Sequence, residues 1–121
     1  MLRTALIAGA VLLLILALDH CRPEYRITAY CSCEKCCKKS DGITASGANA
    51  IQGYCATRDL PFRTVIEIEG VGIFKIMDRG PVDRRHIDIW FPTHRQALEF
   101  GTRKSRVKVL GLKGVQYVFM Q

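Results

Sequence analysis

Two aspartates near the middle of the chain have the side chains that acid–base chemistry needs. Asp78 ends the apolar run Ile73–Met77 and precedes a strong turn signal, RGP. Asp88 lies inside a second strand-like run, His86–Phe91, where strand propensity disfavours aspartate. An apolar neighbourhood would raise the pKa of this carboxyl and suit it to act as a general acid. The alternative is a solvent-facing aspartate on an edge strand.

Cysteine thiols are the second group of reactive side chains. Four of the six cysteines fall within seven residues, at Cys31, Cys33, Cys36 and Cys37, with Cys55 further along the chain. In an oxidising compartment this pattern predicts disulfides among these five residues. The alternative is a zinc site, because the CxxC spacing is that of a zinc knuckle. No histidine lies close by, so zinc would need four thiolates, and we therefore favour disulfides and predict no metal or cofactor.

The elements that must position these groups are short strands. Alternating or β-rich runs predict strands at Tyr25–Cys31, Gly53–Thr57, Val65–Glu69, Ile73–Met77, His86–Phe91, Arg106–Leu110 and Val115–Met120. The second run should place Asp88 and Trp90 on one face and its isoleucines on the other. One helix is expected at His94–Phe100, between an N-cap threonine and a C-terminal glycine. Short strands with glycine turns favour a small closed barrel, which leaves no unpaired edge.

The first 20 residues are predicted to direct export rather than to join the fold. Ala5–Leu18 is an uncharged apolar run preceded by Arg3, and its 14 residues suit a secretory signal better than a spanning helix of about 20. Either it is removed near Asp19–Cys21, or residues 5–18 remain as a short membrane anchor. Cys21 is a conceivable lipidation site, although the preceding residues fit a lipobox poorly. Residues 21–121 then form one extracytoplasmic domain, which we expect to be secreted, periplasmic or membrane-anchored.

The net charge of +7 favours an anionic partner such as an acidic wall polymer or phospholipid head groups. Nucleic acid is not expected, because the chain is exported and lacks an aromatic-basic stacking pattern. A chain of 121 residues is long enough for one small domain, expected to be a monomer.

Several fragments in order resemble the 3D (three-aspartate) domain. They are TAYC at 28–31, the cysteine cluster, GITASG at 42–47, LP at 60–61, DRG at 78–80, IDI at 87–89 and VKVL at 107–110. That domain is similar to the catalytic barrel of membrane-bound lytic transglycosylase A. The resemblance implies a six-stranded double-psi β-barrel with one short helix. It also implies cleavage of peptidoglycan glycan strands between N-acetylmuramic acid and N-acetylglucosamine, giving a 1,6-anhydro sugar.

The resemblance assigns the three family aspartates to positions of this chain. The third falls on Asp88 as the single acid/base and the second on Asp78. The first fits Asp59 if the loop is shortened. The chain departs from the family pattern where Arg63 replaces a glycine, and again over residues 81–85.

Other residues are candidates for binding the glycan. Thr44, Ser46 and backbone groups at Gly47 and Gly80 could donate to N-acetyl and hydroxyl groups. Arg79 and Arg85 could bind lactyl or peptide carboxylates. Tyr30 or Trp90 could stack on a sugar ring or belong to the core, and His86 and His94 are expected to be structural or surface residues. Two other functions remain open: a non-catalytic wall-glycan-binding barrel, and a zinc or redox module centred on the cysteines.

Overall fold

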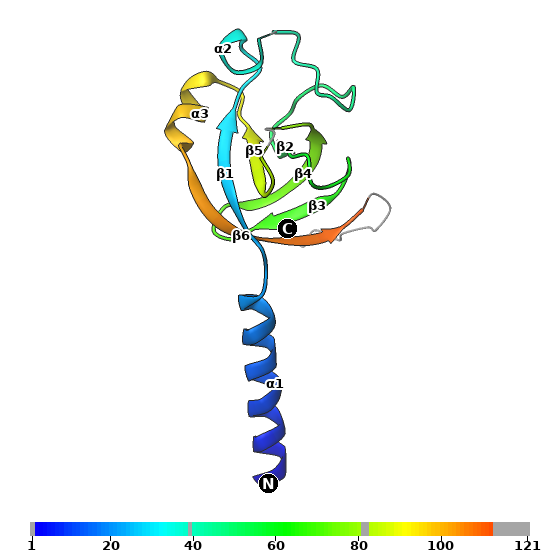
Figure 1. Ribbon diagram of the computed structural model, residues 1–121, viewed down its shortest axis with the longest axis vertical. Helices are drawn as coiled ribbons and strands as arrows, with labels where there is room; N and C mark the ends of the chain where they lie inside the picture. The colour runs from blue at the N-terminus through cyan, green and yellow to red at the C-terminus, as the bar shows by residue number, and fades with distance from the viewer. Residues whose placement is uncertain (1, 39, 81–82, 113–121) are drawn as a thin grey trace.

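Six strands close into a barrel in the computed structural model, which describes residues 2–38, 40–80 and 83–112. The strands are β1 (Glu24–Tyr30), β2 (Tyr54–Ala56), β3 (Val65–Ile68), β4 (Gly72–Asp78), β5 (His86–Trp90) and β6 (Arg103–Gly111). Around the barrel they follow the order β1-β5-β2-β4-β3-β6, and β6 pairs with β1 (Figure 1). Each strand therefore has two neighbours, and the predicted class, a small six-stranded barrel, is confirmed.

The strand ends differ from the predicted ends by at most three residues. The predicted hairpin is the antiparallel pair β3-β4. Two pairs are parallel, β1 with β5 and β2 with β4, and their strands are distant in the sequence. The last predicted strand, 115–120, lies outside the described residues.

The core is built from the inward faces of the strands. Its members are nearly all β-branched or aromatic, namely Tyr25, Ile27, Cys55, Ile66, Ile68, Ile76, Ile87, Ile89 and Val107. Fully burying one isoleucine side chain contributes about 1.5–3 kcal/mol. On β5, Ile87 and Ile89 are buried while Asp88 and Trp90 are only partly buried, so the predicted division of faces is confirmed.

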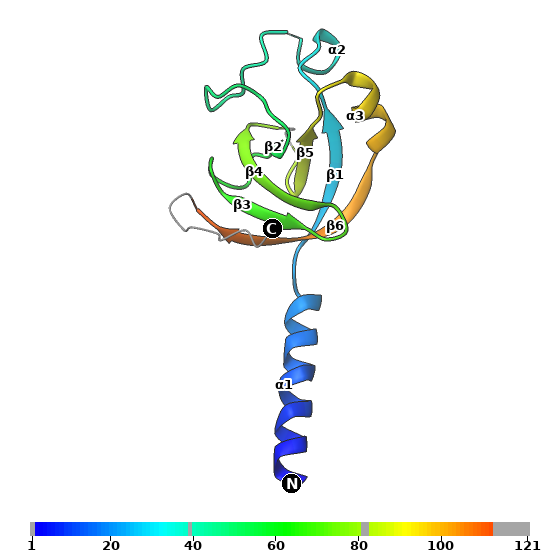
Figure 2. The ribbon, with the colours of Figure 1, turned by 180° about the vertical axis from the view of Figure 1, so that it is seen from behind.

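Three helices accompany the barrel. α1 (Leu2–His20) projects away from it in both views, and its side chains from residue 3 to 17 are exposed (Figures 1 and 2). Among the described residues, no helix is both long and apolar enough to span a membrane. α3 (His94–Phe100) is the predicted helix, and Thr93 and Gln96 form a capping box at its start.

The helix α2 (Glu34–Cys37) was not among the predicted elements. It is a single turn of four residues that follows Cys33 and contains Cys36 and Cys37. α2 and α3 both lie beside the end of β1, at the opposite end of the barrel from α1 (Figure 1). This arrangement brings the cysteine segment close to the start of α3.

Candidate functional site

Asp78 and Asp88 flank one small residue on the outer face of the barrel. β2 lies between β5 and β4, so Ala56 pairs with Asp88 on one side and with Asp78 on the other. Paired residues share a face of a sheet, and two strand spacings separate the aspartate Cα atoms by roughly 10 Å. Because alanine is small, the space between the two carboxyl groups stays open.

An open cleft of about 370 Å³ occupies this space. Its lining residues are Tyr30, Cys36, Cys37, Ala56, Asp78, Arg79, Gly80 and Asp88. Its volume is within the range of about 300–1,000 Å³ that is usual for small-ligand pockets. A Cβ atom added at Gly80 would lie 3.0 Å from the carbonyl oxygen of Ala56, so close packing requires glycine there.

Asp88 has the features of a proton donor. Burial raises its pKa to about 6, the hydrogen bond from Thr28 opposes the rise, and the negative charge of Asp78 adds to it. Thr28 donates to Oδ1 of Asp88 over 2.9 Å. Within the described chain, no hydrogen-bond donor contacts Oδ2. That oxygen can therefore carry a proton toward the cleft.

A chain of hydrogen bonds runs from Arg26 through His86 and Thr28 to Asp88. Thr28 has a single hydroxyl proton, which it donates to Asp88, so it must accept from His86 Nε2, 2.7 Å away. Nδ1 of His86 then accepts from Arg26 over 3.2 Å. Burial, followed by the charge of Arg26, lowers the pKa of His86, in agreement with a neutral ring. His86 thus orients the hydroxyl group that contacts Asp88.

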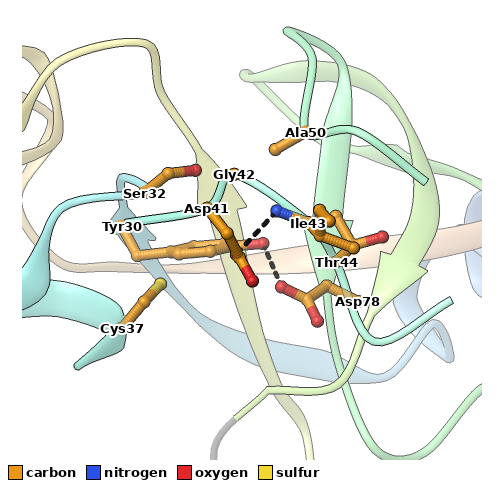
Figure 3. Close-up of a pocket in the computed structure, with 9 residues that line it drawn as sticks. All are labelled: Tyr30, Ser32, Cys37, Asp41, Gly42, Ile43, Thr44, Ala50 and Asp78. Carbon is orange, nitrogen blue, oxygen red and sulfur yellow. Dashed lines mark hydrogen bonds between the residues drawn. The ribbon is translucent and has the colours of Figure 1, made fainter. Parts of the chain in front are cut away.

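Asp78 has the opposite character, because three donors converge on it. The Tyr30 hydroxyl donates to Oδ2 over 2.7 Å, as Figure 3 shows. The backbone N–H groups of Ala45 and Arg79 donate to Oδ1 over 2.7 and 2.9 Å. Burial raises the pKa of Tyr30, and the hydrogen bond to Asp78 adds to the rise, so the phenol keeps its proton. Asp78 is therefore a hydrogen-bond acceptor, in contrast to Asp88, whose raised pKa suits it to carry a proton.

The predicted binding segment 44–47 does not line the cleft. It contacts Asp78 instead, through the backbone N–H of Ala45. Thr44 donates to the Ala48 carbonyl oxygen over 2.9 Å and accepts from Ser46 over 2.9 Å. Thr44 also lines a second cavity of about 30 Å³ on the other side of Asp78, which is room for about one water (Figure 3). Gly47 is exposed, with φ 86°.

Arg79 is the predicted arginine that does line the cleft. Its guanidinium donates to the carbonyl oxygens of Thr57 and Leu60 and lies 3.8 Å from the centre of the Phe62 ring. These contacts fix the position of the guanidinium group, and because both hydrogen bonds come from Nη1, its other nitrogens can still donate to a ligand.

Asp59 and Arg85 lie outside the cleft lining. Both are exposed, and a carboxylate oxygen of Asp59 accepts from the backbone N–H of Arg85 over 2.5 Å. The structure therefore brings two of the three predicted aspartates, Asp78 and Asp88, to one cleft. The third, Asp59, contacts the backbone of Arg85 instead.

The cysteines differ from their prediction. All six are free, so none of the predicted disulfides is present, and Cys55 is buried in the core. The expectation that no histidine lies close to the cluster is wrong. Nδ1 of His94 lies 3.4–3.7 Å from the sulfur atoms of Cys31, Cys33 and Cys36. Sequence spacing missed this because His94 is 58 residues beyond Cys36 and reaches it only through the fold.

Sequence reasoning also missed the supporting roles of Thr28, Tyr30 and His86. Thr28 and Tyr30 are two residues apart on β1, so they share a face, and β1 pairs in parallel with β5 in the register Thr28↔Asp88. The alternation was visible in the sequence, but the pairing with β5 was not.

The comparisons with known proteins give no assignment. No protein-family model matches the chain. No curated protein matches it either. Function is therefore inferred from the residues and the geometry of the site.

Proposed function

We propose that this protein is a lytic transglycosylase that cleaves peptidoglycan glycan strands, with Asp88 as the single acid/base. The observation that carries the proposal is the contrast between the two carboxyl groups of the cleft. Asp88 has a pKa raised to about 6 and an oxygen that no donor among the described residues contacts, and Asp78 accepts three hydrogen bonds. An acid that is still partly protonated near neutral pH is what glycosidic cleavage requires.

The proposed reaction needs one carboxyl group that acts first as an acid and then as a base. Asp88 donates its proton to the bridging oxygen as the bond from that oxygen to C1 of the muramic residue breaks. The ionised Asp88 then takes the proton of the muramic 6-hydroxyl as O6 bonds to C1. No water is consumed, and Asp88 ends protonated. Glycosidases that use water have two working carboxyls, whereas an attached hydroxyl reaches a high effective concentration with one.

Asp78 has a distinct part in this proposal. As a fixed negative charge near Asp88, it helps to keep the acid protonated before reaction and stabilises positive charge that develops at C1. Arg79, at the same cleft, is suited to bind a lactyl or peptide carboxylate of the substrate.

Two features support a 3D-type, double-psi form of the barrel. The first is the presence of two parallel pairs, β1-β5 and β2-β4, in an otherwise antiparallel barrel. The second is Arg63, whose φ of 72° lies in the region that favours glycine. Glycine is the residue that the resembling family carries there.

The proposed substrate also fits the charge and the predicted location. A net charge of +7 favours association with an anionic wall polymer. We place the barrel outside the cytoplasm, with residues 5–18 as its export segment or anchor.

The test is mass spectrometry of peptidoglycan sacculi digested with the purified protein. Wild type should release 1,6-anhydro-muropeptides, and Asp88→Asn should lower the rate by about 10²–10⁴-fold. Asp78→Asn should also be impaired. Asp59→Asn is the matched control, because Asp59 lies outside the cleft, and it should retain activity.

Two results would contradict the proposal. One is wild-type activity that survives in Asp88→Asn. The other is wild-type protein that binds sacculi but forms no anhydro product, which would identify a glycan-binding barrel instead.

A further inference from the structure

Three thiols and one imidazole meet outside the carboxylate pair, at the end of β1. The ligand atoms of Cys31, Cys33, Cys36 and His94 all lie within 4.8 Å of one another. The Cys31 sulfur is 3.1 Å from that of Cys33 and 3.6 Å from that of Cys36. His94 Nδ1 lies 3.7, 3.5 and 3.4 Å from the three sulfurs in chain order. The proposed glycan chemistry uses none of these four side chains.

These separations are close to the edges of a zinc tetrahedron. With Zn–S of about 2.3 Å and Zn–N of about 2.0 Å, the S–S edges are roughly 3.8 Å and the S–N edges roughly 3.5 Å. All three S–N separations lie within a few tenths of an ångström of that value, as does the 3.6 Å S–S separation. Of these five separations, only the 3.1 Å one is clearly shorter, and the sixth edge, between the sulfurs of Cys33 and Cys36, is within 4.8 Å.

A disulfide framework does not account for the arrangement as well. A disulfide bond is about 2.05 Å long, shorter than the shortest sulfur separation here. It also gives no reason for one imidazole nitrogen to lie at nearly equal distance from three sulfur atoms.

The local backbone holds each ligand in place. Cys33 is the N-cap of α2 and Cys36 lies within its single turn. The backbone N–H groups of Cys36 and Cys37 donate to the carbonyl oxygen of Cys33 over 3.1 and 2.9 Å. His94 is the first residue of α3, directly after the capping box at Thr93. The CxxC turn and the capped helix therefore present their ligand atoms from two separate elements, α2 and α3.

We propose that Cys31, Cys33, Cys36 and His94 bind one zinc ion in a closed, four-coordinate structural site. Four protein ligands leave no position for substrate, which is the pattern of structural rather than catalytic zinc. The three cysteines bind as thiolates, so each thiol that is protonated beforehand releases its proton to solvent on binding. The resulting site has two positive and three negative charges.

The position of the site gives it a structural task beside the cleft. Cys36 is a ligand and, with its neighbour Cys37, also lines the cleft that holds Asp88. Zinc would link the cleft-lining segment at Cys36 and Cys37 to His94 at the start of α3. Because α3 begins four residues after β5 ends, the link also reaches the strand that carries Asp88. The ion would thus order a four-residue helix that is too short to be stable alone.

The first test uses the full-length chain, purified in mild detergent with a phosphine reductant and without chelator. We expect one zinc per chain by elemental analysis. After the zinc is removed, Co²⁺ should bind with the absorption of tetrahedral cobalt and thiolate charge-transfer bands. Reduced protein that binds neither metal at equimolar amounts would overturn the proposal. So would mass spectrometry showing that these cysteines are paired in disulfides whose reduction yields no metal binding.

Variants identify the ligands. Cys36→Ser and His94→Gln should each weaken Co²⁺ affinity at least tenfold, and His94→Gln should shift the spectrum as nitrogen is lost from the coordination sphere. Cys37→Ser is the matched control, because the Cys37 thiol donates to the carbonyl oxygen of Cys31 instead. It should keep one metal per chain and the wild-type spectrum. Equal loss in Cys36→Ser and Cys37→Ser, or a spectrum unchanged by His94→Gln, would reject this ligand set.

These measurements need no glycan. Failure of metal binding would therefore leave the proposed glycan cleavage untouched, and failure of that activity would leave the zinc site standing.

Discussion

At the scale of single residues, the site depends on two aspartates that differ in their hydrogen-bond partners. Asp78 accepts three hydrogen bonds, and Asp88 accepts one from Thr28 and is partly buried. The difference gives the two carboxyl groups distinct characters, and the raised pKa of Asp88 makes measurable predictions about pH.

The pH dependence of kcat/KM should follow the protonated form of Asp88. Since its pKa is raised to about 6, kcat/KM should fall with a slope near tenfold per pH unit above that value. Thr28→Val removes a donor that stabilises the carboxylate, so the pKa of Asp88 should rise further and the alkaline limb should move to higher pH. Thr28→Ser, which keeps the hydroxyl, should leave the limb in place. A limb that moves equally in both variants would contradict this assignment.

Asp88→Asn should stabilise the fold at pH 7 while it removes activity. The pKa of Asp88 is raised on folding, to about 6 from 3.8, so its stabilising contribution is present below pH 4 and is lost as pH rises through 6. A neutral amide avoids this loss, and we expect the free energy of unfolding to rise by about 1–3 kcal/mol at pH 7. Urea unfolding at pH 4 and pH 7 measures it.

Glu67→Gln is the matched control, because Glu67 is exposed on β3, which does not pair with the strand that carries Asp88. It should show little change at either pH. A stability difference between wild type and Asp88→Asn that is the same at pH 4 and pH 7 would show that Asp88 does not titrate as described.

At the scale of elements, β2 decides where the two aspartates lie relative to each other. It is a strand of three residues, yet it joins β5 to β4 and so sets the separation of the two aspartates. Ala56 between them is nearly fully buried, and Gly80 packs against its backbone. Larger side chains at either position would fill or distort the cleft.

The turn before β3 contains a strained residue. Arg63 has φ 72°, and its N–H donates to the Ile76 carbonyl oxygen over 2.7 Å, so β4 holds this conformation. A non-glycine residue costs about 1–2 kcal/mol there, and part of the gain from glycine is offset by its freer unfolded chain. Arg63→Gly should therefore raise the free energy of unfolding by up to about 1 kcal/mol.

Lys104→Gly is the comparison for Arg63→Gly, since Lys104 lies exposed in β6. Glycine in a strand should lower the free energy of unfolding by about 0.5–1 kcal/mol. Urea unfolding of both variants measures the difference, and two losses of similar size would show that the turn is not strained.

At the scale of the whole molecule, the barrel and α1 are separate structures. α1 stands clear of the barrel in both views, and its described side chains are exposed along the helix (Figures 1 and 2). The closed hydrogen bonding and the buried isoleucines all belong to residues after α1.

Deletion of residues 1–20 should therefore leave the barrel folded. We expect the unfolding temperature to change by less than about 2 °C, because the deleted helix removes little surface from water. The same deletion should lower association with zwitterionic phospholipid vesicles in flotation assays, because it removes the proposed anchor, residues 5–18. A large drop in unfolding temperature would show that α1 packs on the barrel.

The sequence alone predicted the period-2 faces of β5, the strands along the described chain and the capped helix α3. These features depend on neighbours a few residues apart, where alternation, turns and caps act locally. It also identified Asp78 and Asp88 as the candidates for chemistry.

Which of these groups meet depends on the folded barrel. The pairing of β2 with both β4 and β5 brought Asp78 to Asp88, and the packing of α3 on β1 brought His94 to the cysteines. Asp59, which fits the family pattern only with a shortened loop, lies outside the cleft. Strand pairing between segments distant in the sequence depends on how the whole barrel closes, and local side-chain patterns do not encode which strands become neighbours.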